Sequence, residues 1–275
     1  MRRTPWMLVL LCFAVAAWGQ TAEELVAKNL AAKGGVEKIK AVKSLRAVGR
    51  YQDPSGFTAD VLEVWRGPNN IREVFTLQGM SQVQAYDGTT GWQINPFQGR
   101  KDPELLGEED LRGVVEDADF FGGPLVDAAE KGNKVEYLGH TTVDGDDALR
   151  LKVTLKNGDI FYYYLDPDTY LEFRTERQQF IRGSVREQFT ELGAYKQVNG
   201  VYFPFSMTQG ERKDMSDAAT ITFSKLEANT GVGDTDFKMP AAPAVVSPQK
   251  HTEPPSSQTQ KGKPPAAKPS KPPQP

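Results

Sequence analysis

Apolar and polar side chains alternate along most of the chain after Ser44, and turn residues interrupt the alternation at roughly regular intervals. From Leu149 to Leu155 every second residue is aliphatic and the others are polar, which predicts a strand with one buried and one wet face. Asn157-Gly158 then predicts a tight hairpin. The same reasoning predicts antiparallel strands near 45–52, 58–66, 70–78, 81–87, 90–95, 134–139, 148–156, 160–165, 170–180, 183–193, 201–209 and 219–227.

Helical spacing occurs in two places only. Thr21 and Glu24 form a capping box ahead of an amphipathic segment that Gly34-Gly35 ends, with a short turn following over 36–42. Between Pro103 and Lys131, apolar residues recur at helical intervals on both sides of a Gly-Gly-Pro sequence. This insertion predicts two short helices in an otherwise β protein.

The predicted architecture is mainly β with a helical part. About ten or more antiparallel strands make a sheet that tends to curl or close on itself. We therefore expect one domain over residues 20–239, a curved sheet or half-open barrel with helices across its mouth.

The two ends of the chain have different compositions from this body. Residues 1–19 combine Arg2-Arg3, a short apolar run and Ala17-Trp18-Gly19, which predicts a cleaved signal peptide and export. Cys12, the only cysteine, lies inside this segment, so the exported chain has no disulfide. Residues 240–275 are rich in Pro and Lys and predict a disordered tail.

The body carries more acidic than basic residues, which argues against nucleic acid as a partner. The chain has only two histidines, and His251 is in the tail, so we expect no metal site and no cofactor. No nucleophile elbow, phosphate loop or dinucleotide fingerprint occurs, so we expect no enzyme.

A carboxylate-dependent hydrolase is the remaining catalytic alternative. Its acid and base would be Glu172 with Glu176, or Glu187 with Glu191, because even spacing on a strand places each pair on one face. Acidic residues on strand surfaces are more often only solvated.

Large aromatic residues on the strands point to a second role for the sheet. Most of them fit a core, but a curved sheet covered only by short helices can enclose an apolar cavity. Burying about ten methylenes of an acyl chain is worth roughly 8 kcal/mol, so such a cavity binds lipid without any catalytic group. The candidate cavity residues are Trp65, Phe75, Trp92, Phe161, Tyr163 and Phe223.

Several motifs resemble, in order, the LolA-like outer-membrane lipoprotein carriers. They are the leading helix with Gly34-Gly35, the sequence from Glu63 to Asn69, the Asp87-Gly88, Trp92 and Asn95-Pro96-Phe97 hairpin, the Tyr164-Leu-Asp-Pro turn, the sequence from Val198 to Pro204, and Phe237-Lys-Met-Pro240. The resemblance implies an incomplete β-barrel with a helical lid over an apolar cavity, working in the periplasm.

The resemblance also implies roles for individual residues. The lid residues would be Leu111, Val114, Val115, Phe120 and Phe121. Arg66 matches the arginine that holds the lid shut in the carriers, although Gly67 here separates it from the following proline.

The predicted function is that of a monomeric periplasmic carrier of lipid or acylated lipoprotein, with donor and acceptor proteins in the inner and outer membranes. An envelope sensor or partner-binding module of the same fold is the main alternative. Such regulators have a second folded domain, whereas a Pro-rich tail follows here.

Overall fold

The computed structural model describes residues 20–181 and 183–241. The predicted signal peptide and nearly all of the predicted tail lie outside these residues, so their boundaries stay predictions. Among the described residues, no helix is long and apolar enough to cross a membrane. The helices are α1 (Ala22–Ala32), α2 (Val36–Ala41), α3 (Glu108–Asp117) and the short 3-10 turns η1 (Pro96–Gln98) and η2 (Asp234–Asp236).

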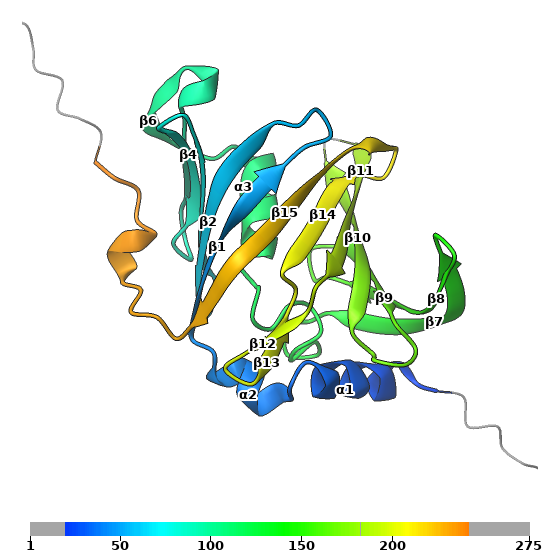
Figure 1. The fold of residues 1–275 in the computed structure, drawn as a ribbon. Helices are drawn as coiled ribbons and strands as arrows, with labels where there is room; N and C mark the ends of the chain where they lie inside the picture. Colours follow the sequence, from blue (N-terminus) through cyan, green and yellow to red (C-terminus); the bar gives the residue numbers. More distant parts are fainter. Residues whose placement is uncertain (1–19, 182, 242–275) are drawn as a thin grey trace, which may run out of the picture. The chain divides into compact units, whose positions relative to one another are not determined.

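The domain is built on one antiparallel sheet of 13 strands, in the order β6-β5-β4-β3-β2-β1-β15-β14-β11-β10-β9-β8-β7, beside the small β12-β13 hairpin (Figure 1). The strands are β1 (Ser44–Gln52), β2 (Thr58–Arg66), β3 (Asn70–Leu77), β4 (Met80–Tyr86), β5 (Gly91–Asn95), β6 (Arg100–Leu105), β7 (Lys134–Val143), β8 (Asp146–Thr154), β9 (Ile160–Leu165), β10 (Glu172–Ile181), β11 (Ser184–Gly193), β12 (Lys196–Val198), β13 (Val201–Phe203), β14 (Ser206–Glu211) and β15 (Asp214–Ala228).

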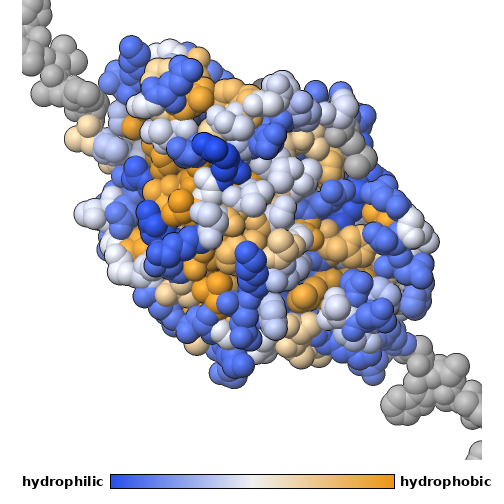
Figure 2. All heavy atoms as spheres, in the orientation of Figure 1, coloured by the Kyte–Doolittle hydropathy of each residue, from blue (hydrophilic) through white to orange (hydrophobic). Residues whose placement is uncertain are grey.

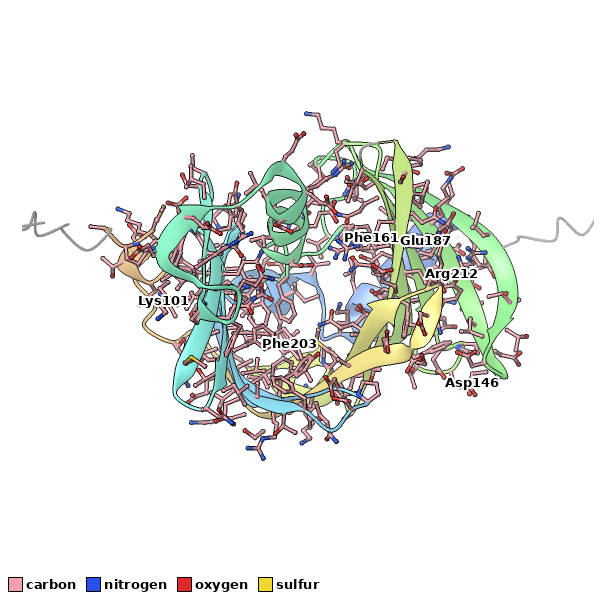
Figure 3. All side chains as sticks on the ribbon, turned by 90° about the horizontal axis from the view of Figure 1, so that it is seen from above. Lys101, Asp146, Phe161, Glu187, Phe203 and Arg212 are labelled. Atoms are coloured by element: carbon pink, nitrogen blue, oxygen red, sulfur yellow. The ribbon has the colours of Figure 1, made fainter. Side chains whose placement is uncertain are left out.

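The sheet is curved but not closed. β6 and β7 are its two edges and do not pair with each other, although they are consecutive in the chain. Residues 106–133, which include α3, therefore have to cross from one edge to the other. Figure 3 shows α3 between the two arms, marked by Lys101 on β6 and Phe161 on β9. The expected incomplete barrel with a helical part is confirmed.

Strand register decides which side chains enter the concave side. Trp65 pairs with Ile71, and Ile71 pairs with Tyr86, so these three share the inner face. Ala85 and Trp92 form the neighbouring pair and point to the outer face. The expected inward series on β8 is also confirmed, since Leu149, Leu151 and Val153 are buried.

The outer face of β2 to β5 is covered by the chain that follows β15 (Figure 1). Phe237 is fully buried there, and its carbonyl oxygen accepts a 2.7 Å hydrogen bond from Trp92 Nε1. Figure 2 shows, on the side where β1, β2 and β15 lie in front, apolar patches between charged side chains.

α1 closes one end of the concave side. The predicted capping box is present, with the Glu24 N–H donating to Thr21 Oγ1 at 3.2 Å. Leu25, fully buried on this helix, packs in one cluster with Leu125 and Leu149. The helix thus joins the insertion to the sheet.

Several local predictions were wrong. Residues 36–41 form a helix instead of a turn, and β6 was not expected. The second helix of the insertion is replaced by successive turns over 120–132, where Asp127 has a φ of 52° that a helix cannot continue through. β15 begins at Asp214 rather than near 219, because it pairs back to Glu211 in a tight hairpin with β14.

Candidate ligand cavity

The concave side of the sheet contains a cavity of about 680 Å³, within the size range of small-molecule sites. Its walls come from β2 and β3 on one arm, β9 to β11 on the other, and β14 and β15 between them. The apolar part of the wall includes Trp65, Ile71, Phe120, Phe161, Leu192 and Met207.

Phe120, directly after α3, divides the space. Its ring stacks on Trp65 with centroids 4.2 Å apart and lies parallel to Phe203 at 5.8 Å. A second cavity of about 160 Å³ lies between Phe120 and α1 and shares Phe120, Leu192 and Met207 with the first. The two spaces are therefore neighbours that share part of one wall.

Arg112 and Arg177 attach α3 to the opposite arm, and Arg186 on β11 lies 3.6 Å from Glu109 on the same helix. Arg112 on α3 donates to both carboxylate oxygens of Asp159 at 2.6 and 2.5 Å, and to the Phe180 carbonyl at 2.9 Å. Arg177 on β10 reaches back to Glu116 at 3.3 Å and Asp117 at 3.1 Å. Because Asp159 is completely buried, its bidentate ion pair is the strongest single tie between the helix and the sheet.

Two carboxyl side chains lie on the inner face of the arm that contains β2 and β3. Glu63 on β2 and Glu73 on β3 stand directly opposite each other in register, between the pairs Val61–Phe75 and Trp65–Ile71. Glu63 is only 3% exposed, and its Oε2 has no hydrogen-bond partner in the described part of the chain. Two like side chains thus share an apolar wall.

The proton affinities of these groups are raised. Burial, reinforced by the charge of Glu73, raises the pKa of Glu63 well above its usual value. Burial also raises the pKa of Glu73 to about 8, with Asp117 adding to the effect and Arg177 opposing it. Burial and the neighbouring Asp159 carboxyl raise the pKa of Glu116 to about 7.

Glu172, near α1, is in a different situation. It accepts hydrogen bonds from Lys33 Nζ at 2.6 Å and Asn29 Nδ2 at 2.8 Å. Burial alone would raise the pKa of Glu172, but the charge of Lys33 and these hydrogen bonds outweigh it, and the pKa is lowered. The Glu172 carboxylate therefore has a structural role, because it connects β10 to α1 through Lys33 and Asn29.

The predicted cavity residues occupy five different locations. Trp65 and Phe161 line the main cavity, and Tyr163 lines the smaller one. Phe75 lies beside the main cavity with its ring edge-on to Tyr51 at 5.8 Å. Phe223 is packed in the core, and Trp92 is on the opposite face of the sheet under Phe237. The hairpin register turns Trp92 outward, because it pairs with Ala85.

The predicted lid residues all lie in the crossing segment. Phe120 lines both cavities, and Phe121 lines the smaller one. Val114 is buried, whereas Val115 is exposed. Leu111 packs on Gly91 so closely that a Cβ there would lie 2.5 Å from its Cδ1.

Arg66 is on the outer face, away from α3. It pairs with Asp234 and lies 5.2 Å over the Phe237 ring, so its contacts hold the segment after β15. Strand parity explains this placement, because Arg66 follows the inward Trp65 directly. The tie on α3 is Arg112 instead.

The predicted acid–base pairs are separated or neutralised. The expectation that Glu172 and Glu176 share a face was wrong, because a register shift between Glu172 and Arg174 turns them to opposite faces. Glu176 lies 3.2 Å from Arg174. Glu187 accepts a 2.6 Å hydrogen bond from Gln178, and Glu191 lies 3.6 Å from Arg174.

Sequence reasoning missed Glu63, Glu73, Arg112 and Asp159. A signal for the first two was present, since each interrupts an alternating apolar series, Val61-x-Glu63-x-Trp65 and Ile71-x-Glu73-x-Phe75. No sequence signal joins Arg112 to Asp159, because they are 47 residues apart. Among the described residues, no group of three or more side chains is arranged to hold a metal ion.

Comparison with known proteins identifies the fold. No family model and no curated protein matches the chain. A LolA superfamily protein from Nitrosomonas europaea matches with a TM-score of 0.54 at 12% identity, over 80% of this chain and 98% of that one. A putative outer membrane lipoprotein-sorting protein domain from Vibrio parahaemolyticus gives 0.50 at 14%, over 77% and 97%. A DUF1329 family protein from Desulfovibrio piger gives 0.53 at 12%, over 79% and 95%. The chain therefore has the LolA-like fold.

Proposed function

We propose that this protein is a non-enzymatic periplasmic carrier that holds the acyl chain of a lipid or lipidated protein in the concave cavity. The observation that carries the proposal is the cavity itself, about 680 Å³ between the arms of an unclosed sheet. A domain with a filled core would offer an acyl chain no such space.

The walls suit a flexible hydrocarbon chain. Trp65, Phe161 and Met207 lie on three different parts of the sheet around one space, so a chain between them would contact apolar atoms on several sides. Each buried methylene contributes roughly 0.8 kcal/mol. We expect Phe120 to move aside when a longer chain extends into the smaller cavity.

Release of the cargo requires the cover to open. The crossing segment is continuous with the sheet only at its two ends, and Arg112 and Arg177 provide its polar ties to the far arm. We expect donor and acceptor proteins of the two membranes to act on this segment. The lipoprotein-sorting name of the Vibrio structure supports that assignment.

The proposal is tested by measuring the lipid that co-purifies with the protein. Protein isolated from a bacterial periplasm should retain acyl lipid that denaturing extraction and mass spectrometry detect at a stoichiometric level. Thr190→Trp fills the cavity wall on β11 and should abolish the retained lipid. Thr222→Trp adds the same bulk at an exposed site on the outer face of β15 and should retain it.

Lipid-free wild-type protein that also fails to take up added acyl lipid would refute the proposal. Equal retention by the Thr190→Trp and Thr222→Trp variants would show that lipid adheres elsewhere.

A further inference from the structure

The charges around the main cavity are strongly unequal. Seven acidic side chains line it against one basic side chain. The base, Arg177, is already engaged by Glu116, Asp117 and Gln188 at 2.8 to 3.3 Å. The acidic residues are Glu63, Glu73, Glu116, Asp117, Glu211, Asp214 and Asp217.

These acidic side chains differ in their exposure to solvent. Glu211, Asp214 and Asp217 are exposed, whereas Glu63 is almost completely buried. A cleft lined by charge of one sign concentrates ligands of the opposite sign. An anionic head group would meet the exposed acidic side chains of Asp214 and Asp217 at the entrance, whereas Glu211 lies 3.5 Å from Arg186.

The buried carboxyl group of Glu63 provides a second, independent observation. A buried carboxyl normally finds a donor, as Glu172 does in Lys33 and Asn29. Glu63 Oε2 has none among the described residues, and the side chain lines the cavity beside Trp65. A buried carboxyl that lines a ligand-sized space without a donor from the described residues points to a donor on the ligand.

We propose that the cavity selects an amphiphile that joins an apolar chain to a protonated amine, with the ammonium held between Glu63 and Glu73. This inference rests on the proposed carrier function and narrows its cargo. An ammonium group has three donors and no acceptor, which matches a pair of carboxyl groups. The Tyr51 and Trp65 rings in the same wall suit a cation as well.

The chain of such a ligand has an apolar route from that point. Trp65 and Ile71 flank the carboxyl pair in register, and Phe161, on the other arm (Figure 3), lines the same cavity. A metal ion would need more ligands than the pair provides, and no group of three is arranged for one among the described residues.

The experiment compares three ligands with the same twelve-carbon chain, below their micelle concentrations. Dodecylammonium, dodecanol and dodecanoate are titrated into the lipid-free full-length protein and followed by calorimetry. We expect dodecylammonium to bind at least about tenfold more tightly than dodecanol, because a charge-assisted hydrogen bond is worth one such factor or more. Dodecanoate should bind most weakly.

Glu63→Gln and Glu73→Gln should each remove most of the preference for dodecylammonium while leaving dodecanol binding intact. Asp60→Asn, on the exposed outer face of β2, is the matched control and should change neither. Because glutamine has the same shape, a melting temperature at or above that of the wild type will show that the variants fold.

Proton release gives a second readout. Burial raises the pKa of Glu63 and of Glu73, which face Asp117 from α3 and Arg177 from β10, so this pair should release protons when the ammonium binds. The apparent binding enthalpy will then depend on the ionisation enthalpy of the buffer.

Equal affinity for dodecylammonium and dodecanol would overturn the inference and leave the carrier function standing. Failure of all three ligands to bind would overturn the carrier function as well. A preference that survives in Glu63→Gln and Glu73→Gln would place the cation elsewhere and overturn the assignment.

Discussion

The buried carboxyl groups on or beside the curved sheet differ in the partners that they have. Asp159 is held by Arg112, and Glu172 by Lys33 and Asn29. Glu63 faces another carboxyl, Glu73, and its Oε2 has no donor in the described residues. The paired groups have cationic and amide donors, whereas burial and the facing Glu73 carboxyl raise the pKa of Glu63.

The direction of each pKa shift follows from this contrast. The pKa of Glu172 is lowered and those of Glu63 and Glu73 are raised, although burial acts on all three in the same direction. The nearest charge decides the sign. We conclude that burial by itself does not separate a structural carboxylate from one that is available to a ligand.

The largest effect should come from breaking the Asp159 pair. Arg112→Met leaves a fully buried carboxylate without its guanidinium and should lower the free energy of unfolding by about 3–5 kcal/mol, measured by urea denaturation. Arg100→Met, which breaks an exposed pair with Glu104, is the control and should cost less than about 1 kcal/mol. Similar losses in both variants would show that Asp159 is not specially dependent on Arg112.

An intermediate effect is expected at Glu172. Lys33→Met should cost about 2 kcal/mol at neutral pH, less than a fully buried pair because Lys33 is partly exposed. The lowered pKa contributes stability above the ordinary value of 4.5 and loses it as the pH falls through the folded value. The difference between wild type and variant should therefore shrink in acid, as urea titrations at several pH values will show. If the difference in unfolding free energy between wild type and variant does not change with pH, Lys33 acts through packing alone.

The smallest effect, with the opposite pH dependence, is expected at Glu73. Its folded pKa of about 8 lies above the ordinary value of 4.5, so the folded state holds the proton more tightly, and ionisation destabilises it as the pH rises between these values. Wild-type stability should fall on the order of 1 kcal/mol over this interval, because half-buried Glu73 can turn partly toward solvent. Glu73→Gln should flatten the curve. If stability depends on pH just as steeply in the variant as in the wild type, ionisation of Glu73 is not the cause of the pH dependence.

Local patterns predicted much of the sheet. Alternation placed most of the strands within a few residues, and the capping box of α1 was read correctly from Thr21 and Glu24. These features depend on side chains near one another in the chain. The sequence also predicted the unclosed, curved sheet, because so many antiparallel strands cannot stay flat.

Errors arose where one residue changes strand parity or ends a helix. The register shift after Glu172 reversed the face of Glu176, and the positive φ of Asp127 helped break the insertion into turns. Trp92 was assigned to the cavity on its size, although its hairpin partner Ala85 turns it outward. Composition and spacing carry no record of such shifts.

The amino-acid sequence by itself determined the strand periodicity, the presence of a helix within residues 103–131 and the supply of aromatic side chains, because each follows from neighbouring residues. Tertiary structure alone decided that Arg112 meets Asp159 and that Lys33 pairs with Glu172. It also decided that Glu63 Oε2 finds no hydrogen-bond donor within residues 20–181 and 183–241. The physical reason is that charge compensation depends on distances between segments far apart in the chain, which only the curvature and register of the whole sheet establish.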